Sequence, residues 1–86
     1  MPKQRRANQQ RQKPRNSGRE QLHSVVATAA PKDGWFRVVS HEGTDLFSEY
    51  VGKDFNEARK IAEKVATPGI TCYIHNYHNR VIHTAR

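Results

Sequence analysis

The sequence has one cysteine, few aromatic residues and no long apolar run. A single cysteine, Cys72, excludes an internal disulfide framework and suits a reducing compartment. The first residues are basic, but no apolar run follows them, so we expect no secretory signal. No stretch approaches the roughly 20 apolar residues that a membrane span requires. We therefore expect a cytoplasmic protein with no membrane partner.

Signatures of catalysis are missing as well. Ser40 and Ser48 have no placed base and acid of the kind that activates a hydroxyl nucleophile. Gly43 and Gly52 are isolated, so the chain has no glycine-rich phosphate loop. Cys72 alternates with apolar residues and is expected to be a small buried hydrophobe. These absences predict that the protein is not an enzyme and uses no cofactor.

The chain does hold residue types that bind zinc: Cys72, His75, His78 and His83. Cys72 and His75 are three residues apart in a predicted strand, so their side chains leave opposite faces. The spacing matches no standard zinc pattern, and we predict no metal site. The five histidines of the chain suggest instead that binding depends on pH, because protonation adds positive charge.

Positive charge is concentrated at the start of the chain. Residues 1–21 hold seven basic side chains against one acid, whereas residues 22–86 hold eight against seven. The seven are Lys3, Arg5, Arg6, Arg11, Lys13, Arg15 and Arg19. This segment has almost no apolar side chains to offset the entropy cost of folding, so we predict a disordered basic arm. Such an arm is attracted to a polyanion, above all nucleic acid, although it also fits a solubilising terminus.

One helix is predicted clearly, over residues 54–66. Its apolar residues recur at steps of three and four and form one stripe: Phe55, Ala58, Ile61, Ala62 and Val65. Asp54 and Glu57 match a capping box, and a Thr-Pro-Gly sequence at 67–69 ends the helix. A helix with one apolar face must pack on another element, so we expect a sheet beneath it.

Four segments around the helix are predicted strands: residues 35–40, 46–51, 70–75 and 80–84. Residues 41–45 predict a hairpin with a longer or bulged loop. The order is ββαββ, which predicts an α+β fold with a mainly antiparallel sheet and the helix on one face. The predicted organisation is a disordered arm over residues 1–21, a lead-in with a possible edge strand over 22–33, and the folded domain over 34–86.

Strand alternation divides the predicted sheet into two faces. Towards the helix it places Phe36, Val38, Phe47, Cys72 and Ile74. On the opposite face it places Trp35, Arg37, Tyr50, Tyr73 and His75. Aromatic rings beside basic groups on an exposed sheet are typical of folds that stack single-stranded bases. The alternative is that these rings pack against residues 22–30 or against a second subunit.

Four short motifs carry a resemblance: Gly-Trp-Phe-Arg-Val at 34–38, Asn-Glu-Ala at 56–58, Tyr-Ile-His at 73–75 and Arg-Val-Ile at 80–82. Together they resemble a small bacterial and phage domain of unknown function, over about residues 34–84. The last turn of that family usually carries Asp-Gly, where this chain has Tyr-His-Asn at 77–79. The family has no established activity, so the resemblance implies the order of the elements and leaves the function open.

The sequence as a whole predicts a small nucleic-acid-binding protein, with RNA favoured over DNA. The arm would contact phosphates without reading sequence, and the folded domain would supply shape or a stacking platform through Trp35, Arg37, Tyr73 and His75. The alternative is a protein-interaction module, such as a phage-type inhibitor or adaptor, that uses a sheet edge or the aromatic face. Homodimerisation through that face is a variant of this alternative.

Overall fold

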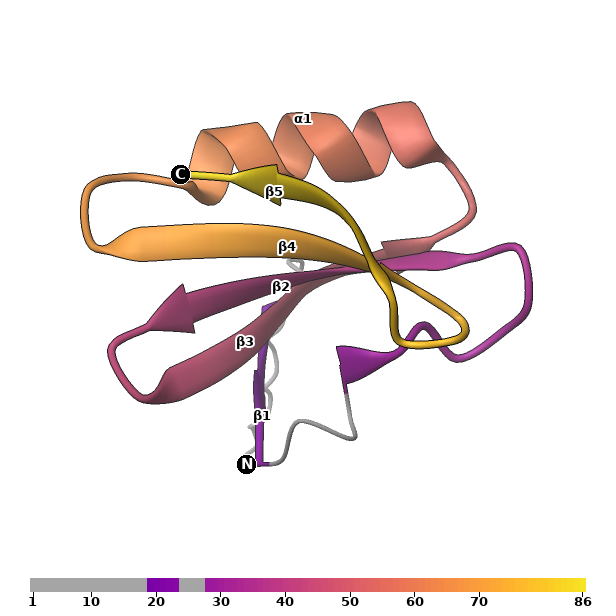
Figure 1. Cartoon of the computed structure of the whole chain (residues 1–86), viewed down its shortest axis with the longest axis horizontal. Coiled ribbons are helices and arrows are strands. Elements are labelled where there is room, and N and C mark those ends of the chain that lie inside the picture. Colours follow the sequence, from indigo (N-terminus) through magenta and orange to yellow (C-terminus); the bar gives the residue numbers. More distant parts are fainter. Residues whose placement is uncertain (1–18, 24–27) are drawn as a thin grey trace, which may run out of the picture.

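The structure, a computed structural model, describes residues 19–23 and 28–86. These residues form one antiparallel sheet of five strands, in the spatial order β1-β3-β2-β4-β5, and one helix. The elements along the chain are β1 Glu20–Leu22, β2 Phe36–Glu42, β3 Asp45–Gly52, α1 Phe55–Val65, β4 Ile70–Asn76 and β5 Val81–Ala85. Figure 1 shows α1 lying over one face of the sheet. The predicted α+β class, in which one hairpin precedes the helix and another follows it, is confirmed.

The helix begins and ends as its sequence predicts. Asp54 is the N-cap, and its carboxylate accepts a hydrogen bond from the backbone N–H of Glu57. Ala66 is the C-cap, and Gly69 follows with a φ of 96°, a conformation that glycine adopts without strain. No helix in the described ranges has the length and apolar character that crossing a membrane requires.

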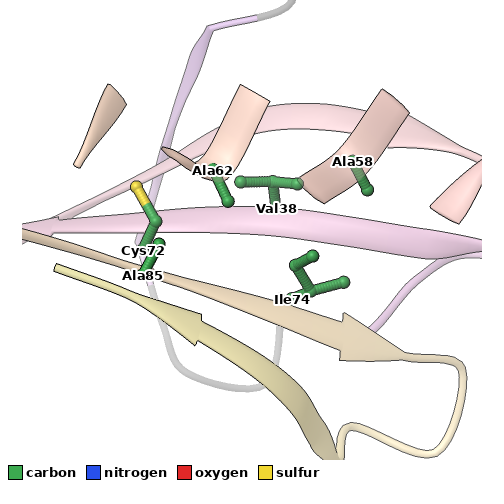
Figure 2. Close-up of a cluster of buried hydrophobic side chains, with 6 residues drawn as sticks. All are labelled: Val38, Ala58, Ala62, Cys72, Ile74 and Ala85. Atoms are coloured by element: carbon green, nitrogen blue, oxygen red, sulfur yellow. The ribbon is translucent and has the colours of Figure 1, made fainter. Parts of the chain in front are cut away.

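A small core lies between α1 and the sheet. Its buried members are Val38, Ala58, Ala62, Cys72, Ile74 and Ala85 (Figure 2). Four of these six side chains are alanine or cysteine, so the helix approaches the sheet closely and the larger Val38 and Ile74 fill the space between them. Phe36 and Phe55 close one side of this core, with ring centroids 5.5 Å apart in an edge-to-face arrangement. The predicted burial of Cys72 is confirmed, because none of its surface is exposed.

A bulge in β3 reverses part of the predicted division into faces. Val38 pairs with Tyr50 and Val39 pairs with Ser48, so Glu49 has no partner on β2. This extra residue changes the alternation, and Tyr50 packs against the core beneath α1. The prediction that Tyr50 lies on the face away from the helix was therefore wrong, since alternation cannot reveal a bulge.

The first hairpin turn is tighter than predicted. Glu42 pairs with Asp45, so the loop is Gly43-Thr44 and not residues 41–45. Gly43 has a φ of 63°, which fits the first central position of a two-residue turn of type II′. The consequence is a longer β2, which brings His41 into the sheet.

The edge strand lies earlier in the chain than the predicted lead-in. β1 pairs with β3 through Glu20–Ser48, Gln21–Phe47 and Leu22–Leu46. Two of its three residues fall in the range that composition assigned to the arm, because a polar edge strand resembles a disordered segment in composition. Residues 24–27 of the predicted lead-in, and the predicted disorder of residues 1–18, lie outside the described residues.

Candidate nucleic-acid interface

The structure brings three of the predicted site residues together on the face away from α1. Arg37 of β2 pairs with His75 of β4, and Val39 pairs with Tyr73. The rings of Tyr73 and His75 have centroids 6.3 Å apart. His41 joins them, 4.7 Å from the Tyr73 ring. The sequence reasoning missed His41 because it ended the strand at residue 40, although His41 lies at the same alternation position as Arg37.

This face is covered by residues 28–30, which we call the strap. The backbone N–H of Ala30 donates to the carbonyl of Asn76 over 3.2 Å, which ties the strap to the end of β4. The hydroxyl of Thr28 donates to the Asn79 side chain over 2.6 Å. Thr28 and Ala30 are buried. Figure 1 shows the chain leading into β2 on the side of the sheet opposite α1, near the turn between β4 and β5.

Arg37 is held within the fold and does not project from it. Its Nε donates to the carbonyl of Ala29 over 3.0 Å, and its Nη1 donates to the Ser48 hydroxyl over 2.7 Å. Burial lowers the pKa of the Arg37 guanidinium, and the charge of Glu20 opposes that shift. The guanidinium therefore joins the strap to β3, with two of its donors bound to protein groups.

The other two residues of the face are partly or wholly covered. His75 is only 8% exposed, and Tyr73 is half-buried. Val39, beside them, has no exposed surface. The described residues therefore favour the alternative in which this face packs against the lead-in, and of its rings only Tyr73 and His41 keep partial exposure.

Trp35 lies apart from this cluster, immediately before β2. Its backbone N–H donates to the carbonyl of Lys32 over 3.0 Å, closing a turn. The Lys32 ammonium lies 4.8 Å from the centroid of the indole ring. Trp35 is half-buried and Lys32 is exposed, so this aromatic and basic pair is partly accessible to solvent.

Arg19 is bound to its own domain. It forms ion pairs with Glu42 and with Glu49, the latter at 2.9 Å, and its guanidinium lies 3.8 Å from the centroid of the Phe47 ring. The Ser40 hydroxyl donates to the same Glu49 carboxylate over 2.6 Å. Two carboxylates thus balance the charge of Arg19. The other predicted arm residues, Lys3, Arg5, Arg6, Arg11, Lys13 and Arg15, lie outside the described residues.

Neither a pocket nor a metal-binding group occurs in the described part of the chain. Cys72 lies in the core under α1, whereas His75 lies on the opposite face, as their spacing predicts. Burial, with a smaller effect from Glu49, raises the pKa of the Cys72 thiol to about 11. At neutral pH Cys72 is therefore a protonated, buried thiol, unlike the exposed thiolate of a nucleophilic cysteine.

Replacing Arg37 by methionine is expected to destabilise the protein by about 1–3 kcal/mol, because the buried Ser48 hydroxyl and the Ala29 carbonyl lose their partner. Urea unfolding measures the loss. Lys53→Met, at an exposed position, is the control and should change stability by less than about 0.5 kcal/mol. Arg37→Met combined with Ser48→Ala should cost less than the two single changes together; additive losses would contradict the direct contact.

Comparison of the chain with protein-family models, with curated proteins and with solved structures finds no match in any of the three. The resemblance to a small bacterial and phage domain therefore stays a prediction.

Proposed function

We propose that the protein binds nucleic acid through residues 1–18, in the cytoplasm. The observation that carries this proposal is the separation of charge along the chain. Residues 1–18 hold six basic side chains and no acid, whereas residues 19–86 hold nine basic side chains and eight acids. A run of positive charge without interspersed acids is attracted to phosphates by counterion release, without reading sequence.

The folded part supplies little of the charge in this proposal. Arg19 and Arg37 are held by protein groups, and Arg59 is paired with Glu63 at 3.3 Å on α1. With acids interleaved on its outer side, α1 is poorly suited to enter a DNA major groove. RNA is favoured as the ligand because arginine-rich segments commonly fold on RNA. The domain would then serve as a carrier for the basic segment, with the Trp35–Lys32 pair as its accessible contact.

The test compares two full-length variants that each lose six positive charges. The first replaces Lys3, Arg5, Arg6, Arg11, Lys13 and Arg15 by glutamine. The second replaces Lys32, Lys53, Lys60, Lys64, Arg80 and Arg86 by glutamine. Both have the same net charge, so a difference between them reports where the charge lies.

Fluorescence anisotropy with single-stranded RNA and with duplex DNA at low salt measures the outcome. We expect the first variant to lose binding and the second to keep most of it. Equal loss in both variants would mean that net charge alone attracts the ligand, and retention by the first variant would overturn the proposal.

A second candidate function, binding of a protein partner, is favoured by β5. This strand forms one edge of the sheet, and its outward backbone groups can pair with an added strand. Tyr77, Val81 and Ile82 expose 46%, 49% and 43% of their surface beside it. Arg80 and Arg86 flank the strand. If two copies of β5 paired antiparallel about His83, Arg80 of one copy would lie opposite Arg86 of the other, and their like charges would repel. The edge therefore suits a different extended partner, one with an apolar centre and acidic ends.

A synthetic peptide with alternating valine and threonine between glutamate ends tests this candidate. We expect it to shift the backbone amide NMR signals of residues 81–85, and we expect Ile82→Lys to abolish the shifts. The same peptide with lysine ends is the control and should have no effect. Equal shifts from both peptides, or shifts elsewhere in the sheet, would contradict the candidate.

A further inference from the structure

The buried imidazole of His75 has an unusual environment. Both ring nitrogens are shielded from solvent, and neither makes a hydrogen bond of good geometry in the described part of the chain. A neutral imidazole carries one N–H donor, so His75 already leaves one donor and one acceptor unmet. Protonation would leave two donors and a positive charge in the same place, which is far more costly to bury.

The strap is hydrogen-bonded to three residues around this imidazole. It bonds to the residue after His75, because Ala30 donates to the Asn76 carbonyl. It also bonds to the cross-strand partner of His75, because Arg37 donates to the Ala29 carbonyl. A third bond, from Thr28 to Asn79, fixes the strap to the turn that follows β4. Water can reach the His75 ring freely only if these contacts open.

The charged groups around His75 give a protonated imidazole no compensation. On the same face lie Arg37 and His41 from β2, Tyr73 from β4 and, near Arg37, Glu20 from β1. Glu49 of β3 is engaged by Arg19 and Ser40, and His83 of β5 lies with Phe55 beneath α1. Lys32, Asp33, His78 and Arg80 are exposed in the adjoining turns. Residues 1–18 and 24–27 contain no acid that could act as a partner.

We propose that the strap is a pH-dependent latch, docked while His75 is neutral and released when His75 is protonated. Release would uncover the face formed by Arg37, Tyr73 and His75, which the docked strap hides. The inference rests on the described fold and does not depend on whether residues 1–18 bind nucleic acid.

The direction of the effect follows from the pKa of His75. Burial is the largest cause and lowers the pKa below the ordinary imidazole value. The nearby side chain and backbone of Asn79 raise it, His41 and Arg37 lower it, and the net shift is downward. The open form, with an ordinary pKa of about 6.5, therefore takes up protons more readily than the closed form. The strap is fully favoured above about pH 6.5 and loses stability as the pH falls through that value.

The test is NMR on the full-length protein between about pH 7.5 and pH 5.0. We expect the protection of the Ala30 amide against hydrogen exchange to fall by up to about 30-fold, the ratio that an open-form pKa of about 6.5 allows. The amide of Ile74, in the core strand, should keep its protection. The imidazole signals of His75 and the Ala30 amide signal should change with the same midpoint.

Two variants distinguish the contribution of His75 to the pH response from that of the other histidines. His75→Gln removes the titrating group and should make Ala30 protection independent of pH, whereas His78→Gln, in the exposed turn, should behave like the unmodified protein. If His75→Gln fails to fold, the shared midpoint in the unmodified protein decides the question. Constant Ala30 protection in that protein, a pH response that survives in His75→Gln, or simultaneous loss at Ala30 and Ile74 would each overturn the latch.

Discussion

Replacing Ile74 by alanine is expected to lower the free energy of unfolding by about 2–5 kcal/mol. Ile74 has no exposed surface and is among the largest fully buried side chains of the described residues. Its fully buried neighbours in the core are mostly alanine and cysteine, which are too short to fill the space left behind, and the larger Phe36, Tyr50 and Phe55 pack against this core from partly buried positions. The cost of whatever cavity these rings leave unfilled adds to the lost transfer free energy.

Urea unfolding followed by circular dichroism measures this loss, and Ile82→Ala is the matched control. Ile82 is 43% exposed and is the residue of β5 that the bulge leaves unpaired. The same substitution there should cost less than about 1 kcal/mol. Similar losses at the two positions would mean that the core beneath α1 does not dominate the stability of the domain.

The elements predicted best are those whose signal is local in the sequence. The helix depends on the spacing of Ala58 and Ala62 and on the Asp54 cap, and the structure places all three as predicted. Cys72 and Ile74 alternate within a strand that is buried on the helix side, and they were assigned to the correct face. Periodicity and capping act over a few residues, so a single sequence contains them fully.

The features that were missed arise between distant segments. The bulge at Glu49 that reverses Tyr50 is visible only in the pairing of β2 with β3. The candidate site was predicted only in part for the same reason. Arg37, Tyr73 and His75 do share a face, but the sequence left open whether residues 22–30 pack against it, because that packing is a contact between distant segments.

Because the face that holds Arg37, Tyr73 and His75 is covered, the salt dependence of binding becomes a test of the nucleic-acid hypothesis. If an open sheet stacked bases, binding would include a component that resists salt, because stacking releases no counterions. With the face covered by the strap at neutral pH, binding through residues 1–18 should be almost entirely electrostatic. The salt dependence therefore separates the two forms of the hypothesis.

Single-stranded RNA is expected to bind about 300-fold more weakly at about 200 mM salt than at about 50 mM, if all six basic side chains of residues 1–18 contact phosphates. The reason is that each contact contributes about 0.7 to the logarithmic salt slope on a single strand. Duplex DNA, with about 0.9 per contact, should lose about 2,000-fold over the same interval. Anisotropy titrations at four or more salt concentrations measure both slopes.

The glutamine variant of residues 1–18 should show a slope near zero, because it retains none of the six charges. The variant that loses six charges from residues 32–86 should keep nearly the full slope, since its segment of uninterrupted positive charge is intact. A steep slope in the first variant would place the phosphate contacts on the folded domain. A shallow slope with tight binding in the unmodified protein would restore stacking, and the half-buried Trp35 would then be the first ring to replace.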